Sequence, residues 1–540
     1  MSHAHFLSQL PALAGTLEPP FSDARSAREW LKLLPLINVP VAHAEMRQAL
    51  HELNRSAISA LDSLKIAEQF REAIHILQDG LLAHYCNKAI PLLAKEADAW
   101  QAALSLWQEL EACYARCWHA ALIGQSEVAD FQPLLAERSL YCCQKVNLTY
   151  LLVHRAIPAQ QWQQQFCYYQ LAVSQGIAQQ KARDSLLLIG ENSCAEHVFL
   201  HSLLLSVANP FLFSLRDLQW INERLELFAT RCSLQKNAET LPGRTPYYID
   251  LNSADAPQRL VGEIKDQQLS ISTLHLAQVL SKRIKLLRSG ELPEKIGLGT
   301  TLGPQAAEQL LLELYRLWCE HPSERSLPRR EQEKTVEVGF GLTNLHHWIA
   351  QGRFTPPPQE ESQLTSQELM QIRLFGQTST YHQAVAAPTI HTHRWQIKDE
   401  TAKGMHLYRK HTGDRTQLQQ LLIIQDQQHF LIGNVRWLSD ANDELHIGVQ
   451  LLPGVPQAAT VRAQDAARFG QAEHTAALLL PAMPALKTPN SLILPSGWFR
   501  QGRLLEMWDG QAKIRIRLVS ILSRGTDFER VHFLSSGGQN

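Results

Sequence analysis

The chain has 540 residues, of which 45% are hydrophobic and 19% are charged, and its formal net charge is −1. A chain of this length is expected to hold several domains, and its composition is typical of an ordinary soluble globular protein. The net charge excludes a general electrostatic attraction to nucleic acid or acidic membranes. No stretch reaches the roughly 18 apolar residues of a membrane span, and MSHAHFLSQLPALAG lacks the features of a signal peptide. The nine cysteines lack zinc-ligand spacing, which favours reduced thiols and a cytoplasmic location.

The first part of the chain, residues 1–240, is predicted to form an all-helical domain. Its apolar residues recur every three or four positions, as they do along one face of a helix. One such stripe, read as a single helix, contains Leu50, Leu53, Ala57, Leu61, Leu64, Ala67, Ile74 and Leu77. The prolines that separate the helical runs are Pro91, Pro133, Pro158, Pro210 and Pro242.

Residues 241–320 are predicted to contain a linker strand followed by a smaller helical segment. The stretch Leu241–Leu260 is rich in turn residues and interrupts the helical period. The helical period returns in Ala307–Glu320, after the start signal Gly303-Pro304.

After residue 321 the apolar period changes from 3.6 to 2, which is typical of β-strands. Val336, Val338 and Phe340 alternate with polar residues, and Gly433 lies at a phase change that indicates a β-bulge. We predict two small antiparallel β-barrels, one over 321–456 with a helix and loop insertion near 343–390, and a second over 457–540. The fold class is therefore an α+β multidomain protein.

Two short motifs in the first predicted barrel carry polar chemistry. Arg325 and Arg329 form R-x-x-x-R directly before a strand, and Arg330 follows them. Asp399, Thr401 and Gly404 form D-x-T-x-x-G between two strands. Each motif alone is typical of ordinary structure, a solvated helix face for the first and a turn for the second. Their occurrence together at strand boundaries is more specific.

Together these motifs resemble the signature of the PilZ family, over roughly Ser323 to Pro453. The resemblance implies a six-stranded β-barrel that binds cyclic di-GMP, a bacterial second messenger. The whole layout resembles proteobacterial proteins with an N-terminal helical region, a PilZ barrel and a second, degenerate PilZ-like barrel. Thr401 stands where the family usually has serine, and the motifs lie further apart than is usual.

The ligand chemistry suits these residue types. Guanidinium groups bind phosphate and the guanine O6/N7 edge bidentately, and a carboxylate accepts hydrogen bonds from guanine N1–H and N2–H₂. A glycine permits positive φ in the turn and a close backbone approach. The predicted cyclic di-GMP site consists of Arg325, Arg329, Arg330, Asp399, Thr401 and Gly404, with Arg394 and Arg436 added from their positions beside the predicted strands.

We therefore predict a cyclic di-GMP receptor that relays binding to its helical domain or to a protein partner. Regulation of biofilm formation or motility is a family-level expectation. No catalytic constellation is visible, so we expect neither an enzyme nor a cofactor. The alternative is a helical scaffold or chaperone-like adaptor whose PilZ-like barrel no longer binds nucleotide.

Three histidine-bearing stretches are candidate metal sites. Cys194, His197 and His201 share one predicted helical face, and His346–Trp348 and His391–His393 are short clusters. No further ligands accompany them, so side-chain packing is favoured and no metal is expected.

Overall fold

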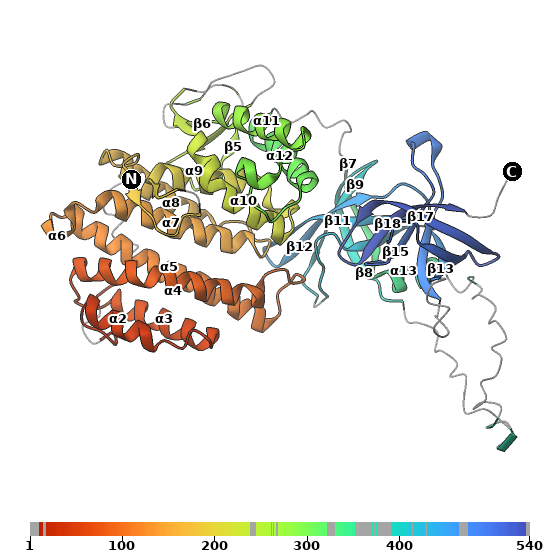
Figure 1. The fold of residues 1–540 in the computed structure, drawn as a ribbon, viewed down its shortest axis with the longest axis horizontal. Helices are drawn as coiled ribbons and strands as arrows, with labels where there is room; N and C mark the ends of the chain where they lie inside the picture. Colours follow the sequence, from red (N-terminus) through yellow and green to blue (C-terminus); the bar gives the residue numbers. More distant parts are fainter. Residues whose placement is uncertain are drawn as a thin grey trace. The chain divides into compact units, whose positions relative to one another are not determined.

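The computed structural model of the chain describes residues 10–13, 18–188, 190–237, 245–260, 262, 264–265, 268–320, 330–350, 354, 370, 373–374, 390–412, 414–427, 429–463 and 474–535 (Figure 1). The chain divides into two compact units. One comprises Met1–Ser326 with Ser439–Ala441, and the other comprises Leu327–Leu438 with Asn442–Asn540.

The first unit is predominantly helical. Its longer helices are α2 (Ala24–Leu33), α3 (Val39–Leu53), α4 (Ala60–Tyr85), α5 (Ala94–Leu122), α7 (Gln132–Leu151), α8 (Ala159–Ser174), α9 (Ala195–Val207), α10 (Leu215–Phe228), α11 (Leu274–Arg288) and α12 (Pro304–Cys319). The apolar stripe that predicted one helix over 50–77 is divided between α3 and α4. Ser59 begins α4, because its side chain accepts a hydrogen bond from Asp62 N (3.1 Å).

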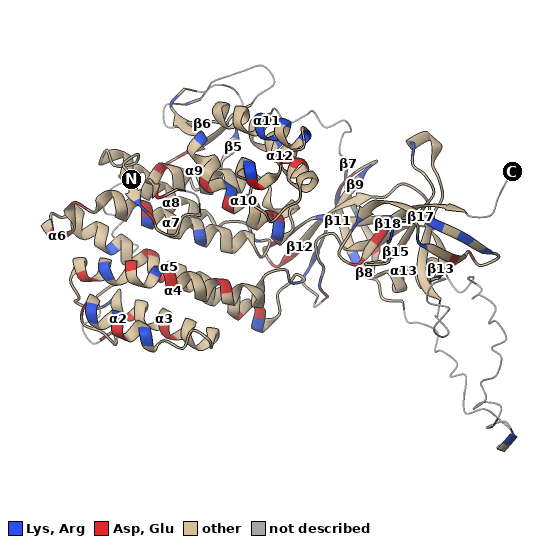
Figure 2. Ribbon diagram, in the orientation of Figure 1, with Lys and Arg blue, Asp and Glu red and all other residues tan. Residues whose placement is uncertain are grey.

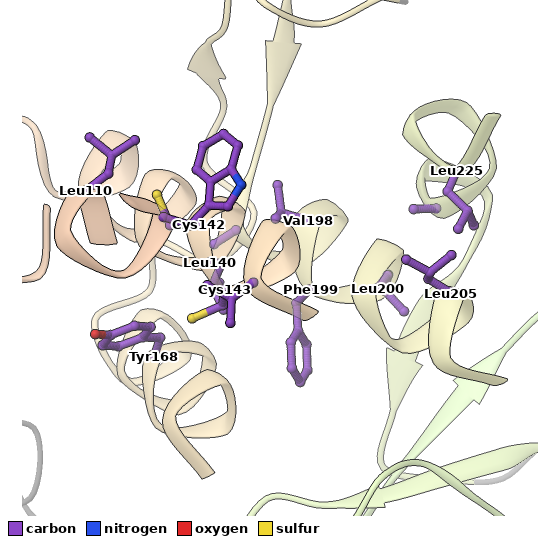
Figure 3. Packing of buried hydrophobic residues seen from close by; sticks show 14 of the residues in the cluster. Leu110, Leu140, Cys142, Cys143, Tyr168, Val198, Phe199, Leu200, Leu205 and Leu225 are labelled. Atoms are coloured by element: carbon purple, nitrogen blue, oxygen red, sulfur yellow. The ribbon is translucent and has the colours of Figure 1, made fainter. Parts of the chain in front are cut away.

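One hydrophobic core joins the helices of this unit, from Phe21 to Cys319. Figure 3 shows part of it, where Cys143 of α7, Tyr168 of α8 and Phe199 of α9 meet. All nine cysteines are free thiols, as predicted. Within the described residues, no helix combines the length and apolarity needed to cross a membrane.

The region from Ser233 to Glu320 contains more β-structure than the sequence indicated, and its first strand lies within the part predicted to be all-helical. Strands β3 (Ser233–Gln235), β4 (Tyr247–Asp250), β5 (Gln258–Arg259) and β6 (Gln268–Ser272) form a sheet in the order β3-β6-β4-β5. Helices α11 and α12 follow this sheet. Leu280 and Leu311 from these helices belong to the same core as the N-terminal helices.

The second unit contains two closed six-stranded barrels, which confirms the predicted fold class. The first barrel, in the order β10-β11-β12-β9-β8-β7, is built from β7 (Arg330–Phe340), β8 (His393–Thr401), β9 (Gly404–Lys410), β10 (Leu421–Asp426), β11 (His429–Ala441) and β12 (Glu444–Leu451). The second, in the order β13-β14-β15-β18-β17-β16, is built from β13 (Gln457–Ala463), β14 (Thr475–Leu480), β15 (Ser491–Pro495), β16 (Leu504–Trp508), β17 (Lys513–Arg524) and β18 (Phe528–Ser535).

Helix α13 (Leu342–Ala350) packs between the two barrels. Its Leu345 is fully buried in a cluster with Ile423 of the first barrel and Leu480 of the second. The predicted insertion near 343–390 therefore begins with a helix, while most of residues 351–389 lie outside the described residues.

The bulge predicted at Gly433 is absent from the ladder between β10 and β11. The ladder between β10 and β11 runs through the Leu422–Gly433 pair without a register shift, so the bulge prediction is wrong for this ladder. A Cβ atom at Gly433 would lie 2.7 Å from the carbonyl oxygen of Gln450. The glycine therefore permits a close approach of the β12 backbone.

Candidate functional site

The D-x-T-x-x-G motif forms the hairpin between β8 and β9, in which Thr401 pairs with Gly404. The Thr401 hydroxyl donates to the Gly404 carbonyl (3.2 Å) and accepts from Lys403 N (3.3 Å). The hydroxyl thus stabilises the turn. Gly404 does not adopt the positive φ that we predicted. Glycine is needed because a Cβ atom would lie 2.4 Å from the Val449 carbonyl oxygen.

A β-bulge directs Asp399 to the outer face of the first barrel. Ile397 pairs with Leu407, but the next pair joins Asp399 to His406, so Lys398 is an extra residue on β8. Without it, Asp399 would follow Trp395 and Ile397 into the barrel core. With it, Asp399 and His406 share the outer face.

Asp399 faces a cleft of about 300 Å³ on the outside of the first barrel. Its walls are formed by Asp399, Thr401, Lys403, Gly404, Met405, His406, Arg436, Trp437, Gly448, Val449 and Gln450. Four of the predicted site residues therefore come together here: Asp399, Thr401, Gly404 and Arg436. Carboxylate, guanidinium, ammonium and imidazole groups lie beside an indole ring, which suits a ligand with both charged and aromatic parts.

Trp437 and His406 form an aromatic wall of this cleft. Their ring centroids are 4.8 Å apart in an edge-on arrangement. Gly448 makes room for the indole, because a Cβ atom at that position would lie 1.8 Å from Trp437 Nε1. The wall therefore depends on a glycine from the neighbouring strand β12.

His406 also belongs to a line of four titratable groups on β8, β9 and β12. His406 Nδ1 lies 3.6 Å from Asp399 Oδ2, and His406 Nε2 lies 3.2 Å from His446 Nδ1. His446 Nε2 lies 3.5 Å from Glu444 Oε2. Burial lowers the pKa of His446 below its ordinary value, and Lys398 adds to this effect whereas Glu444 opposes it.

Strand β7 begins directly after the arginine motif in the sequence. Arg330 begins β7 with an exposed side chain, and its Cα partner on β8 is Glu400, between Asp399 and Thr401. Arg325 and Arg329 lie outside the described residues. Arg394 does not line the cleft, and its Nε donates to Glu337 Oε1 (3.1 Å).

A histidine is buried in two of the three histidine-bearing stretches, whereas in the third His391 is exposed and His393 Nδ1 lies 3.0 Å from Asp414 Oδ2. His201 is buried and Nε2 contacts Asn222 Oδ1 at 3.0 Å, and burial lowers its pKa to about 3. His346 is also buried, with its pKa lowered to about 4. Among the described residues, no cluster of histidine, cysteine and acidic side chains could hold a metal ion.

The sequence interpretation missed several residues of the cleft, chiefly Lys403, His406, Trp437 and Gly448. The alternation of residues along β9 could have indicated His406, because Gly404, His406 and Tyr408 lie on one face of the strand and Leu407 lies on the other. The pairing of β9 with β12 could not be read from that pattern, since it joins residues about 40 positions apart.

The N-terminal and C-terminal parts of the chain each match a described protein family. Residues 25–239 match the family described as "Cyclic-di-GMP receptor FimW, N-terminal domain", and residues 460–535 match the "FimW C-terminal beta-barrel domain". A relative from Pseudomonas aeruginosa strain PAO1, named "Cyclic-di-GMP receptor FimW", is 23% identical over 90% of this chain and 86% of its own length.

Proposed function

Since the chain belongs to the FimW family, we propose that it is a cyclic di-GMP receptor whose ligand binds in the cleft of the first barrel. The relative's name states that role for that protein. The residues of the cleft supply complementary chemistry for a dinucleotide with two phosphates and two guanines.

Each part of the ligand has a matching group. Asp399 accepts hydrogen bonds from guanine N1–H and N2–H₂, and Arg436 and Lys403 attract phosphate. Trp437 and His406 present aromatic surface to a base. Because the Thr401 hydroxyl is engaged in the turn, we assign it a role in the shape of the site rather than direct recognition.

The observation that carries the proposal is the register of β7 against β8. It places Arg330 opposite Glu400, beside Asp399 and Thr401. Arg329 directly precedes Arg330 in the sequence, so the R-x-x-x-R motif is followed at once by the residue that pairs beside the D-x-T-x-x-G motif. Arg325 and Arg329 thereby remain the proposed ligands for phosphate and guanine edges, with Arg330 assisting.

The attraction for an anionic ligand must be local. The formal net charge of the chain is −1, and Figure 2 shows acidic and basic residues interspersed over helices α2 to α5. Binding should therefore weaken as salt rises, because it depends on charge-assisted contacts between a few side chains and two phosphates. We propose that the helical unit is the output part of the receptor.

Titration calorimetry with cyclic di-GMP tests the proposal. We expect Arg329→Ala and Asp399→Ala each to weaken binding by at least about tenfold, since hydrogen bonds to charged groups contribute roughly 1.5–3 kcal/mol. Thermal unfolding of the unaltered chain should shift upward with ligand by mass action. Arg394→Ala should have the weakest effect of the predicted arginines, because its guanidinium contacts Glu337.

A matched control is Arg515→Ala, an exposed arginine on the second barrel. It should leave affinity unchanged. Unaltered affinity in Arg329→Ala and Asp399→Ala, or no binding by the unaltered chain, would show that the cleft is not a cyclic di-GMP site. The helical adaptor would then be the better description.

A further inference from the structure

The line Asp399–His406–His446–Glu444 crosses three neighbouring strands on the outer face of the first barrel. Register explains the alignment, because Asp399 pairs with His406 on β9, and His406 pairs with Gly448, two residues after His446. Tyr408 stacks on His446 with ring planes 16° apart. Asp399 and His406 line the cleft, so one end of this line meets the proposed ligand.

The four groups in this line carry one proton fewer than their three contacts require. It contains three contacts between acceptor-capable atoms, at 3.6, 3.2 and 3.5 Å. Each contact is attractive only when a proton lies between the two atoms. Two ionised carboxylates contribute none, and two neutral imidazoles contribute one each. One contact therefore sets two acceptors against each other until the histidine pair takes up a third proton.

The surroundings oppose that proton in the ligand-free protein. Burial and Lys398 lower the pKa of His446 and Glu444 raises it. The charged and titratable groups on the neighbouring elements are Arg330 and Glu331 of β7, Lys398 and Glu400 of β8, Lys403 of the turn, Tyr408 of β9 and Arg436 of β11. Counting Asp399 and Glu444 as well, the acidic groups are as many as the cationic ones, so it is chiefly the burial of His446, with Lys398, that disfavours an additional positive charge.

We propose that His406 is a positioning residue for the ligand, and that the His406–His446 pair takes up one proton when an anionic dinucleotide binds in the cleft. This inference rests on the proposed function. A ligand with two phosphate charges favours an imidazolium beside it, and the extra proton completes the contact between His406 and Asp399. Asp399 is then held in place to accept from a guanine.

Linkage gives the sign of the effect. If binding takes up protons, affinity rises as pH falls, by at most about tenfold per pH unit for one proton. The phosphodiesters and guanines of the ligand do not titrate between about pH 6 and pH 8, so they contribute no such dependence. The dependence therefore reports on the protein.

The experiment is calorimetry of the full chain with cyclic di-GMP at about pH 8, 7 and 6 and constant ionic strength, with the affinity change interpreted by linkage. Each titration is repeated in two buffers that differ in ionisation enthalpy, which counts the protons taken up. We expect uptake of up to one proton and a severalfold tighter complex at the lowest pH. His406→Gln and His446→Gln should each make the affinity independent of pH.

His393→Gln is the matched control, because His393 Nδ1 pairs with Asp414 Oδ2 at 3.0 Å and does not line the cleft. That variant should retain the pH profile of the unaltered chain. Binding with no proton uptake, or an unchanged pH profile in both His406→Gln and His446→Gln, would overturn the inference and leave the proposed function standing. No binding at any pH would overturn both.

Discussion

At the scale of single residues, Gly448 and Trp437 show how the cleft depends on close approach. The absence of a Cβ atom at Gly448 lets the indole lie against β12, with 1.8 Å between its Nε1 and the position such an atom would take. The shape of the cleft wall therefore depends on the absence of a side chain at Gly448.

Gly448→Ala tests this dependence. The added methyl must displace the indole, so we expect a loss of roughly 1–3 kcal/mol in unfolding free energy, typical of overpacking. Cyclic di-GMP affinity should fall as well, because Trp437 lines the cleft. Denaturant unfolding and calorimetry measure the two effects.

The companion variant is Trp437→Leu, alone and combined with Gly448→Ala. Because the smaller side chain removes the clash, the double variant should be more stable than the sum of the single effects predicts. Strict additivity would show that the two residues do not interact.

At the scale of elements, α13 joins two barrels that would otherwise have separate cores. Leu345 and Trp348 lie in a cluster that draws residues from both barrels, and Trp348 meets Phe430 with centroids 5.4 Å apart. Direct contacts continue the junction, since Leu421 N donates to Asp527 Oδ1 at 2.9 Å. The second barrel is thus packed against the proposed sensor barrel.

Leu345→Ala should therefore destabilise the two-barrel unit by about 2–5 kcal/mol, the usual range for a buried leucine that leaves a cavity. Denaturant unfolding followed by tryptophan fluorescence measures the change. Thr343→Ala on the exposed face of the same helix is the control, with an expected effect within about 0.5 kcal/mol. Equal effects of the two variants would contradict the packing role of α13.

At the scale of the whole molecule, buried histidines link the stability of the helical unit to pH. Burial lowers the pKa of His43 to about 4 and that of His201 to about 3. Below the unfolded value of 6.5 the unfolded chain binds protons that the folded chain excludes. The contribution of these histidines to the free energy of unfolding is therefore fully present above about pH 6.5, and it is lost as pH falls toward their pKa in the folded protein.

We expect the unfolding free energy to fall by roughly 2 kcal/mol for each of these histidines when pH is lowered from about 7 to about 5. Urea unfolding followed by far-ultraviolet circular dichroism, which reports mainly on the helices, measures the loss. His201→Gln should reduce the pH dependence of the unfolding free energy by about the contribution of one histidine. His84→Gln, at an exposed position, should not, and a similar reduction there would contradict the assignment.

The sequence alone established the order of a helical half and two β-barrels, because the 3.6 and 2 periods are local properties that each segment carries by itself. It also predicted Asp399, Thr401, Gly404 and Arg436 for one site, and in the structure these four residues line one cleft. It could not separate α3 from α4 correctly, because the apolar spacing continues through the turn at 54–59 and only packing and the Ser59 cap decide the break.

The tertiary structure decided what depends on pairing between distant strands. The extra residue at Lys398 turns Asp399 outward, and closure of the barrel places β12 beside β9, where His406 meets His446 and Gly448 admits Trp437. Register is a relation between strands, and local periodicity determines only which residues share a face. For this reason the chemistry of the site was visible in the sequence, whereas its aromatic wall and its line of histidines required the folded barrel.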